Sequence, residues 1–100
     1  MKYSVETTNR FEKALKKCIK KGLRMDKFKT VVDILSSTGS LPPQYRPHKL
    51  SGEYAGIWEC HIESDWLLLW EQNDTSLTLL LVDTGRHSDI FLSLIHISEP

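Results

Sequence analysis

The chain begins with an alternating pattern of polar and apolar residues and then changes to a helical one. The alternation over residues 2–7 predicts a short, half-buried strand. Asn9 and Glu12 follow in the Asx-x-x-Glu spacing that caps helix starts, and Gly22 predicts the helix end. Between them the apolar residues recur with the period of one helical face, at Phe11, Ala14, Leu15, Cys18 and Ile19. We therefore expect a strand followed at once by an amphipathic helix.

A second helical pattern starts shortly after Gly22. Asp26 lies near its start, and the polar run 36–40 is expected to end it. Its apolar positions are Met25, Phe28, Val31, Val32 and Leu35. Because only Gly22 and Leu23 join the two helices, we expect them to form an antiparallel hairpin.

The second half of the chain predicts a loop followed by a sheet. Three prolines and two glycines interrupt residues 41–56, which favours an irregular loop. Three strands follow at residues 57–62, 66–71 and 77–83, with a turn at 72–75. Their short connections favour an antiparallel meander. The predicted order is β-α-α-β-β-β, an α+β domain with the helix hairpin packed on one face of an antiparallel sheet.

Length and composition indicate one small domain. The 100 residues, 40% of them hydrophobic, suffice for a single core. The first residues lack the apolar segment of a signal peptide, and the longest apolar run, 79–82, is too short to span a bilayer. Cys18 and Cys60 fit buried thiols in a reducing compartment better than a disulfide. We therefore expect a soluble cytoplasmic protein with no membrane partner.

Charge is divided unevenly along the chain. The first 50 residues contain 12 Lys and Arg against 4 Asp and Glu, a net charge of +8, whereas the last 50 contain 1 against 9, a net charge of −8. This division predicts one surface that attracts polyanions. The alternative is that the lysines of the first helix merely solvate its outer side, namely Lys13, Lys16, Lys17, Lys20 and Lys21.

Three histidines, His48, His61 and His87, are the main candidates for chemistry, because imidazole exchanges protons near neutral pH. His61 lies near the end of a predicted strand, Asp65 lies across the following turn, and His87 follows the last strand. These strand ends can share one edge of the sheet, and the loop with His48 can fold back over it. The alternatives are that His48 is an ordinary surface residue and that His61 is a half-buried strand residue hydrogen-bonded to Asp65. A zinc site formed by all three histidines is a weaker alternative.

Metal-free RNA cleavage requires residues of these types. A base takes the proton of the ribose 2′-OH, an acid protonates the departing 5′-oxygen, and cations stabilise the charge that develops on the phosphate. Two imidazoles, a carboxylate and an Arg or Lys meet these needs. Trp66 or Phe91 can stack on a base, although a strand tryptophan is more often part of the core. Cys18 is not favoured as a nucleophile, since its place on the apolar stripe predicts burial.

Three segments resemble motifs of the YafQ-type toxins, which belong to the RelE superfamily of bacterial toxin–antitoxin systems. Residues 41–52, LPPQYRPHKLSG, are similar to a loop of these toxins. Residues 58–70 resemble their strand pair with the pattern H-x-x-x-D-W, and residues 84–91, TGRHSDIF, resemble their closing segment TGSHSDLF. The resemblance covers about residues 1–91. Residues 92–100, which include His96, resemble translated sequencing-adapter DNA, so we expect this tail to be foreign to the domain.

The resemblance implies a RelE-like, microbial-ribonuclease-like fold and a ribosome-dependent mRNA endoribonuclease that needs no metal or other cofactor. The implied partners are mRNA in the ribosomal A site, the ribosome and a cognate antitoxin. The implied catalytic residues, carried over by motif position, are His48, His61, Asp65 and His87. We expect His87 to be the general acid and either His61 or Asp65 to be the base. The expected substrate contacts are Arg46, Lys49, Trp66, Arg86 and Phe91.

One position departs from the family pattern R-T-G-x-H. This chain has Asp83 in place of the arginine, and a carboxylate there would repel the phosphate. Arg86, next to His87, is our candidate for the replacement cation. The alternative is a catalytically weakened relative that acts as an antitoxin- or ribosome-binding module.

Overall fold

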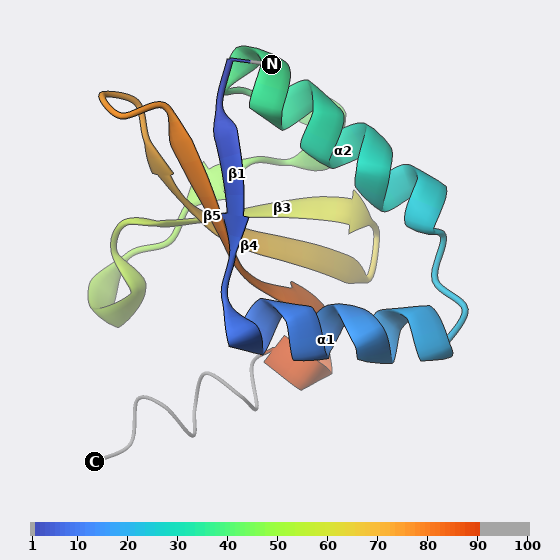
Figure 1. Cartoon of the computed structure of the whole chain (residues 1–100). Coiled ribbons are helices and arrows are strands. Elements are labelled where there is room, and N and C mark those ends of the chain that lie inside the picture. Colours follow the sequence, from blue (N-terminus) through green and yellow to red (C-terminus); the bar gives the residue numbers. More distant parts are fainter. Residues whose placement is uncertain (1, 91–100) are drawn as a thin grey trace.

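The structure, a computed structural model, describes residues 2–90 and places two long helices on one face of a five-stranded sheet (Figure 1). Its helices and strands are β1 (Ser4–Thr7), α1 (Asn9–Lys20), α2 (Met25–Thr38), the 3-10 helix η1 (Pro43–Tyr45), β2 (His48–Lys49), the 3-10 helix η2 (Gly52–Tyr54), β3 (Ile57–Glu63), β4 (Trp66–Asn73) and β5 (Thr78–Gly85). The strand order is β1-β5-β4-β3-β2, in which β1 runs parallel to β5 and the other neighbours are antiparallel. The predicted α+β class and the meander of β3, β4 and β5 are confirmed.

The segment predicted as a loop, residues 41–56, contains a short strand. His48 and Lys49 form β2, which pairs with Glu59 and Trp58 of β3. The loop prediction is therefore wrong at these two residues. The prolines exclude ladder hydrogen bonds only where they stand, and the two residues that follow Pro47 are available to pair as an edge strand.

The start of α1 and the ends of α1 and α2 show capping interactions or left-handed glycines, with two corrections to the predicted boundaries. Thr8, rather than Asn9, caps α1, because its hydroxyl accepts a hydrogen bond of 3.0 Å from the backbone N–H of Phe11. Gly22 follows the end of α1 in the left-handed conformation, at φ 78°, as predicted. The polar run expected to stop α2 instead forms its last turn, and the helix ends where Gly39 turns left-handed at φ 78°.

The two helices diverge from their short connection as an open V over the same face of the sheet (Figure 1). The predicted packing on one face is confirmed, although the helices are splayed rather than side by side. Phe28 of α2 lies between the two layers, with ring centroids 5.9 Å from Phe11 of α1 and 6.4 Å from Trp66 of β4. In the part of the chain that the structure describes, neither helix has the length and apolar character that crossing a membrane requires.

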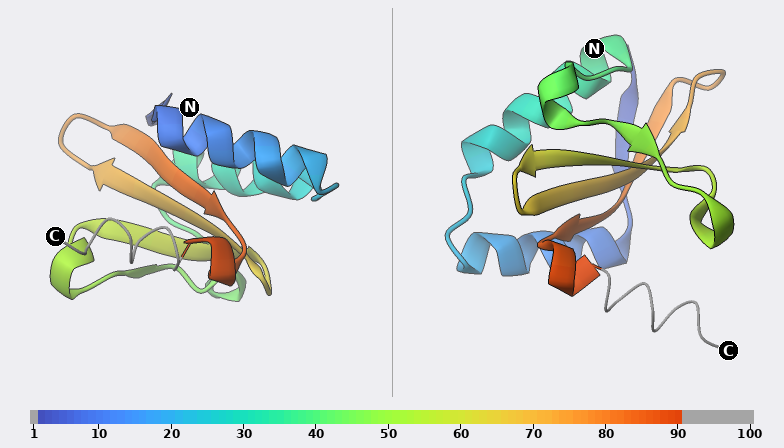
Figure 2. Two further views of the ribbon diagram at one scale, coloured as in Figure 1. Left: turned by 90° about the horizontal axis from the view of Figure 1, so that it is seen from below. Right: turned by 180° about the vertical axis from the view of Figure 1, so that it is seen from behind.

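The far face of the sheet is covered by different segments. The segment 50–57 and the helical turn 87–90 lie on this side (Figure 2). Leu67 and Leu69 of β4 form a small buried cluster with Ile90 of that turn, and partly buried apolar residues of the segment 50–57 pack against it. The register pairs His61 with Leu67 and Leu67 with Gly85. The end of β3, the start of β4 and the end of β5 therefore meet at one end of the sheet, where the candidate site lies.

Candidate active site at the ends of strands β3 and β5

Three of the predicted catalytic residues converge at this end of the sheet. The rings of His61 and His87 lie with their centroids 5.6 Å apart, inclined at 45°. Nδ1 of His87 lies 3.5 Å from Oδ1 of Asp65, and the same oxygen accepts a hydrogen bond of 3.3 Å from the backbone N–H of His87. We call these three residues the histidine cluster.

The turn between β3 and β4 fixes the orientation of both rings. Nδ1 of His61 lies 3.3 Å from the backbone carbonyl of Ser64. A carbonyl only accepts hydrogen bonds, so this contact assigns the proton of a neutral His61 to Nδ1 and leaves Nε2 as an acceptor. Asp65 faces Nδ1 of His87 in the same way. The arrangement offers one imidazole as a proton acceptor beside a second imidazole that a carboxylate orients.

His48 lies apart from the histidine cluster, in the neighbouring row of the same sheet. Its Nε2 is 3.3 Å from Oε1 of Glu59, and its Nδ1 is 3.0 Å from the backbone carbonyl of Arg46. His48 stands opposite Glu59 in the register, and His61 follows two residues along β3. Such diagonal positions are separated by roughly 7–8 Å, which is close enough for one RNA substrate to contact both histidines.

The structure separates the predicted substrate contacts. Lys49 extends over the ring of Trp58, with Nζ 5.6 Å from the centroid, on the face of β3 opposite to His48. Trp66 is only 1% exposed, and its indole N–H donates to the Thr84 hydroxyl at 2.9 Å. Stacking of Trp66 on RNA is therefore wrong for this fold, because α2 already covers the ring. Phe91 lies outside the described residues.

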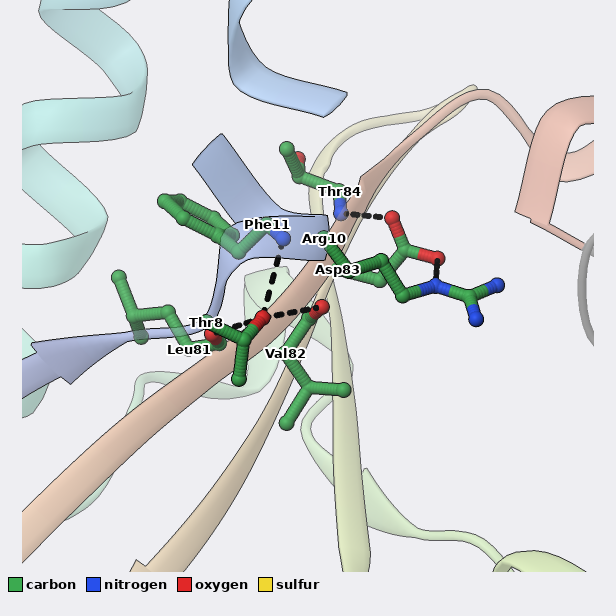
Figure 3. Close-up of polar contacts among 7 residues, drawn as sticks. All are labelled: Thr8, Arg10, Phe11, Leu81, Val82, Asp83 and Thr84. Atoms are coloured by element: carbon green, nitrogen blue, oxygen red, sulfur yellow. Dashed lines mark hydrogen bonds and ion pairs between the residues drawn. The ribbon is translucent and has the colours of Figure 1, made fainter. Parts of the chain in front are cut away.

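Asp83 has a partner that the sequence did not reveal. Its Oδ2 accepts a hydrogen bond of 3.1 Å from Nε of Arg10 on α1, and its Oδ1 accepts one of 2.9 Å from the backbone N–H of Thr84 (Figure 3). The Asp83 side chain is 7% exposed. Its charge is therefore balanced locally by Arg10. Arg86, the predicted replacement cation, is exposed and lines a cleft beside α1 together with Arg10.

The described residues offer neither a reactive thiol nor a group of metal ligands. Cys18 and Cys60 are both buried, and burial raises the pKa of Cys18 and raises that of Cys60 to about 12. Neither thiol is a nucleophile, because the thiolate is the reactive form. Within residues 2–90 no three His, Cys, Asp or Glu side chains are grouped closely enough to hold a metal ion.

Comparisons with known proteins identify a family for this chain. The sequence profile of the family described as "Bacterial toxin of type II toxin-antitoxin system, YafQ" matches residues 3–92. The mRNA interferase toxin YafQ of Escherichia coli K12 is 31% identical over 88 residues, 87% of this chain and 94% of that protein.

Solved structures of toxins have the same fold. A chain of the E. coli DinJ-YafQ toxin–antitoxin complex superposes with a TM-score of 0.81 at 29% identity, covering 91% of this chain and 99% of that one. A metal-bound toxin from Helicobacter pylori superposes with a TM-score of 0.81 at 35% identity, covering 89% and 99%. The chain described here belongs to the YafQ family of toxins from type II toxin–antitoxin systems.

Proposed function

We propose that this chain is an mRNA endoribonuclease that inhibits translation in the cytoplasm by cutting mRNA in the ribosomal A site, without a metal ion. A cognate antitoxin is its proposed inhibitor. The observation that carries the proposal is the convergence of His87 with His61 and Asp65, which lie together at the turn between β3 and β4, 22 residues or more before His87. The E. coli relative YafQ is named an mRNA interferase toxin, and a solved E. coli structure contains YafQ in a toxin–antitoxin complex with DinJ.

The proposed reaction uses one histidine as the base and the other as the acid. His61 Nε2 takes the proton of the ribose 2′-OH, whose oxygen forms a new bond to the adjacent phosphorus. The bond from phosphorus to the 5′-oxygen breaks, and His87 gives its proton to that oxygen. The products are a 2′,3′-cyclic phosphate and a 5′-hydroxyl. Asp65 orients His87 and is therefore assigned a positioning role rather than that of the base.

His48 and Glu59 are proposed to support the site from the next row of the sheet. The carboxylate of Glu59 is 7% exposed and lies against the ring of His48. This contact holds the ring on the sheet, at a distance from the histidine cluster that suits contact with a nucleotide beside the cleaved one. Arg46 and Arg86, both exposed, remain proposed contacts to the RNA.

The test is to express the unmodified chain and the variant His87→Gln in a bacterial host that lacks the antitoxin. We expect the unmodified chain to arrest growth and truncate mRNA, and His87→Gln to abolish both. Asp33→Asn is the matched control, since Asp33 is an exposed acid on α2, a helix that contributes no residue to the cluster. Unchanged toxicity of His87→Gln would remove His87 from the mechanism.

Ribosome dependence and metal independence need a purified system. We expect cleavage of mRNA on programmed ribosomes, little cleavage of the same mRNA alone, and no loss of activity in EDTA. Equal cleavage with and without ribosomes contradicts ribosome dependence. If EDTA removes the activity and added metal restores it, the metal-free reaction is contradicted. The H. pylori relative was solved with a bound metal, which is a specific reason to make this measurement.

A second candidate function is a catalytically weakened relative that binds the antitoxin or the ribosome. Asp83 favours it, because this chain lacks the strand cation of the family pattern. Benign expression of the unmodified chain, together with tight binding to its antitoxin, would support this second function over the enzyme.

A further inference from the structure

A cleft of about 660 Å³ lies between α1 and the end of β5, beside the histidine cluster. Five cationic side chains line it, namely Arg10, Lys13, Lys17, Lys21 and Arg86. The three lysines recur every four residues, so they form one stripe along α1. Lys16 and Lys20 of the same helix are exposed but do not line the cleft.

The two acidic side chains of the cleft are each paired with one of these cations. Asp83 binds Nε of Arg10 at 3.1 Å, and Asp89 binds Nζ of Lys21 at 3.0 Å. Five cations and two anions give the cleft a net charge of +3. Asp83 therefore acts as an anchor, because it holds the guanidinium group of Arg10 at the end of β5 through Nε (Figure 3).

The ends of β1 and β5 create the cleft and connect it to the candidate site. β1 ends at Thr7, which is paired with Leu81. β5 continues for four more residues, to Gly85, and β1 does not pair with these. Helix α1 lies along this extension, with the hydroxyl of Thr8 3.2 Å from the carbonyl of Val82. Arg86 then lines the cleft, and the next residue is His87 of the histidine cluster. The cleft and the histidine cluster are therefore joined through the neighbouring residues 86 and 87.

We propose that this cleft binds the phosphodiester backbone of the RNA strand next to the cleaved nucleotide, and that Asp83 holds Arg10 in position for it. The inference rests on the proposed function, since it assigns a substrate-binding surface to the same enzyme. Exposed lysines that neutralise phosphates provide affinity without reading bases. An acidic protein segment is the other polyanion that suits the charge, but Arg86 lines the cleft and directly precedes His87 of the histidine cluster, and this adjacency favours RNA.

The test compares two double variants of α1 that remove the same charge. Lys13→Gln with Lys17→Gln alters the cleft, and Lys16→Gln with Lys20→Gln is the matched control with the same spacing on the same helix. The probe is a short single-stranded 2′-O-methyl RNA, which lacks the attacking hydroxyl, and its binding is followed by fluorescence anisotropy over a range of salt concentrations.

We expect the cleft variant to bind the probe about tenfold more weakly. The slope of log K against log salt concentration should be shallower by about 1.4, because each of the two lost phosphate contacts to a single strand contributes roughly 0.7 to this slope. The control should stay within about twofold of the unmodified chain, because exposed charges farther away are screened. Equal effects of the two double variants, or no measurable binding by the unmodified chain, would overturn the proposal.

The role of Asp83 has its own test. Asp83→Asn keeps the shape but weakens the hold on Arg10, so we expect about twofold to threefold weaker RNA binding. If the carboxylate of Asp83 merely repels phosphate, Asp83→Asn should instead bind the RNA more tightly. Thermal unfolding of each variant checks that it is folded.

Two further outcomes separate this inference from its alternatives. If the cleft variant loses binding to an oligoglutamate peptide but keeps its binding to RNA, the cleft is a protein-docking surface and the proposal is wrong. If the unmodified chain binds RNA through Lys13 and Lys17 but cleaves no mRNA on ribosomes, the cleft stands and the proposed nuclease function fails.

Discussion

Two histidine–carboxylate contacts on this sheet differ in where the carboxylate lies. Glu59, the partner of His48, is on a central part of β3 with 7% of its side chain exposed. Asp65, the partner of His87, is on a turn with 62% exposed, and a second histidine ring lies beside the pair. A buried carboxylate with one partner is held in place, whereas an exposed pair next to another imidazole can exchange protons with a ligand. The first contact is therefore suited to hold the fold and the second to perform the reaction.

Asp65→Asn tests the reactive contact and should have the largest effect of the variants considered in this comparison. The amide removes the charge beside Nδ1 of His87 and permits the wrong ring orientation, so we expect cleavage on ribosomes to fall roughly 10²-fold. Binding to the ribosome should be unchanged. A loss of less than threefold, equal to that of the control Asp33→Asn, would show that the contact does not matter for the reaction.

His48→Gln tests the structural contact. We expect about tenfold slower cleavage and a free energy of unfolding lower by about 1–2 kcal/mol, because Glu59 loses its partner while buried. His61→Gln, which breaks no contact with a carboxylate, should change stability by less than about 0.5 kcal/mol. Urea unfolding of both variants measures the difference. If the two variants are equally stable, the distinction between the two contacts fails.

Trp66→Phe tests whether the tryptophan next to Asp65 acts on RNA or only packs. Since α2 covers the ring, we expect cleavage within about threefold of the unmodified chain and a loss of roughly 1 kcal/mol in stability, from the missing hydrogen bond to Thr84. Thermal and urea unfolding give the stability. A loss of cleavage as large as that of Asp65→Asn would show that Trp66 has a role in the reaction.

Cys60→Ala should leave cleavage unchanged and instead alter the pH dependence of stability. Burial raises the pKa of Cys60 from 9.0 to about 12, so above pH 9 the thiol ionises in the unfolded chain before it does in the folded one. The folded state then loses about 1.4 kcal/mol per pH unit from this group as the pH rises between those values. Urea unfolding between pH 8 and about pH 11 should show a shallower decline for Cys60→Ala. An equal decline contradicts the assignment.

Local patterns predicted most of the fold, because helices and hairpins depend on neighbouring residues. The helical period from Phe11 to Ile19 and the short connections between the last three strands were sufficient. The parallel pairing of β1 with β5 joins residues more than 70 positions apart, and no local pattern records it. The two residues of β2 were concealed because the prolines around them resemble those of an irregular loop.

The candidate site was predictable to the extent that its contacts are local. His61 and Asp65 are separated by one turn, so the sequence places them together, and His87 follows the strand that ends beside them. The contact between Arg10 and Asp83 spans 73 positions and depends on the pairing of β1 with β5. For that reason the sequence suggested only Arg86 as a nearby cation, whereas in the structure Asp83 is paired with Arg10 of α1.

The central claim is that His87 and His61 perform the reaction and that His48 supports it. The most direct measurement is single-turnover cleavage of mRNA on programmed ribosomes by His87→Gln and His48→Gln at the same enzyme concentration. We predict that His87→Gln loses at least roughly 10²-fold in rate, as expected for removal of a general acid, while His48→Gln loses about tenfold. Near-normal cleavage by His87→Gln, or a larger loss with His48→Gln, would contradict the account.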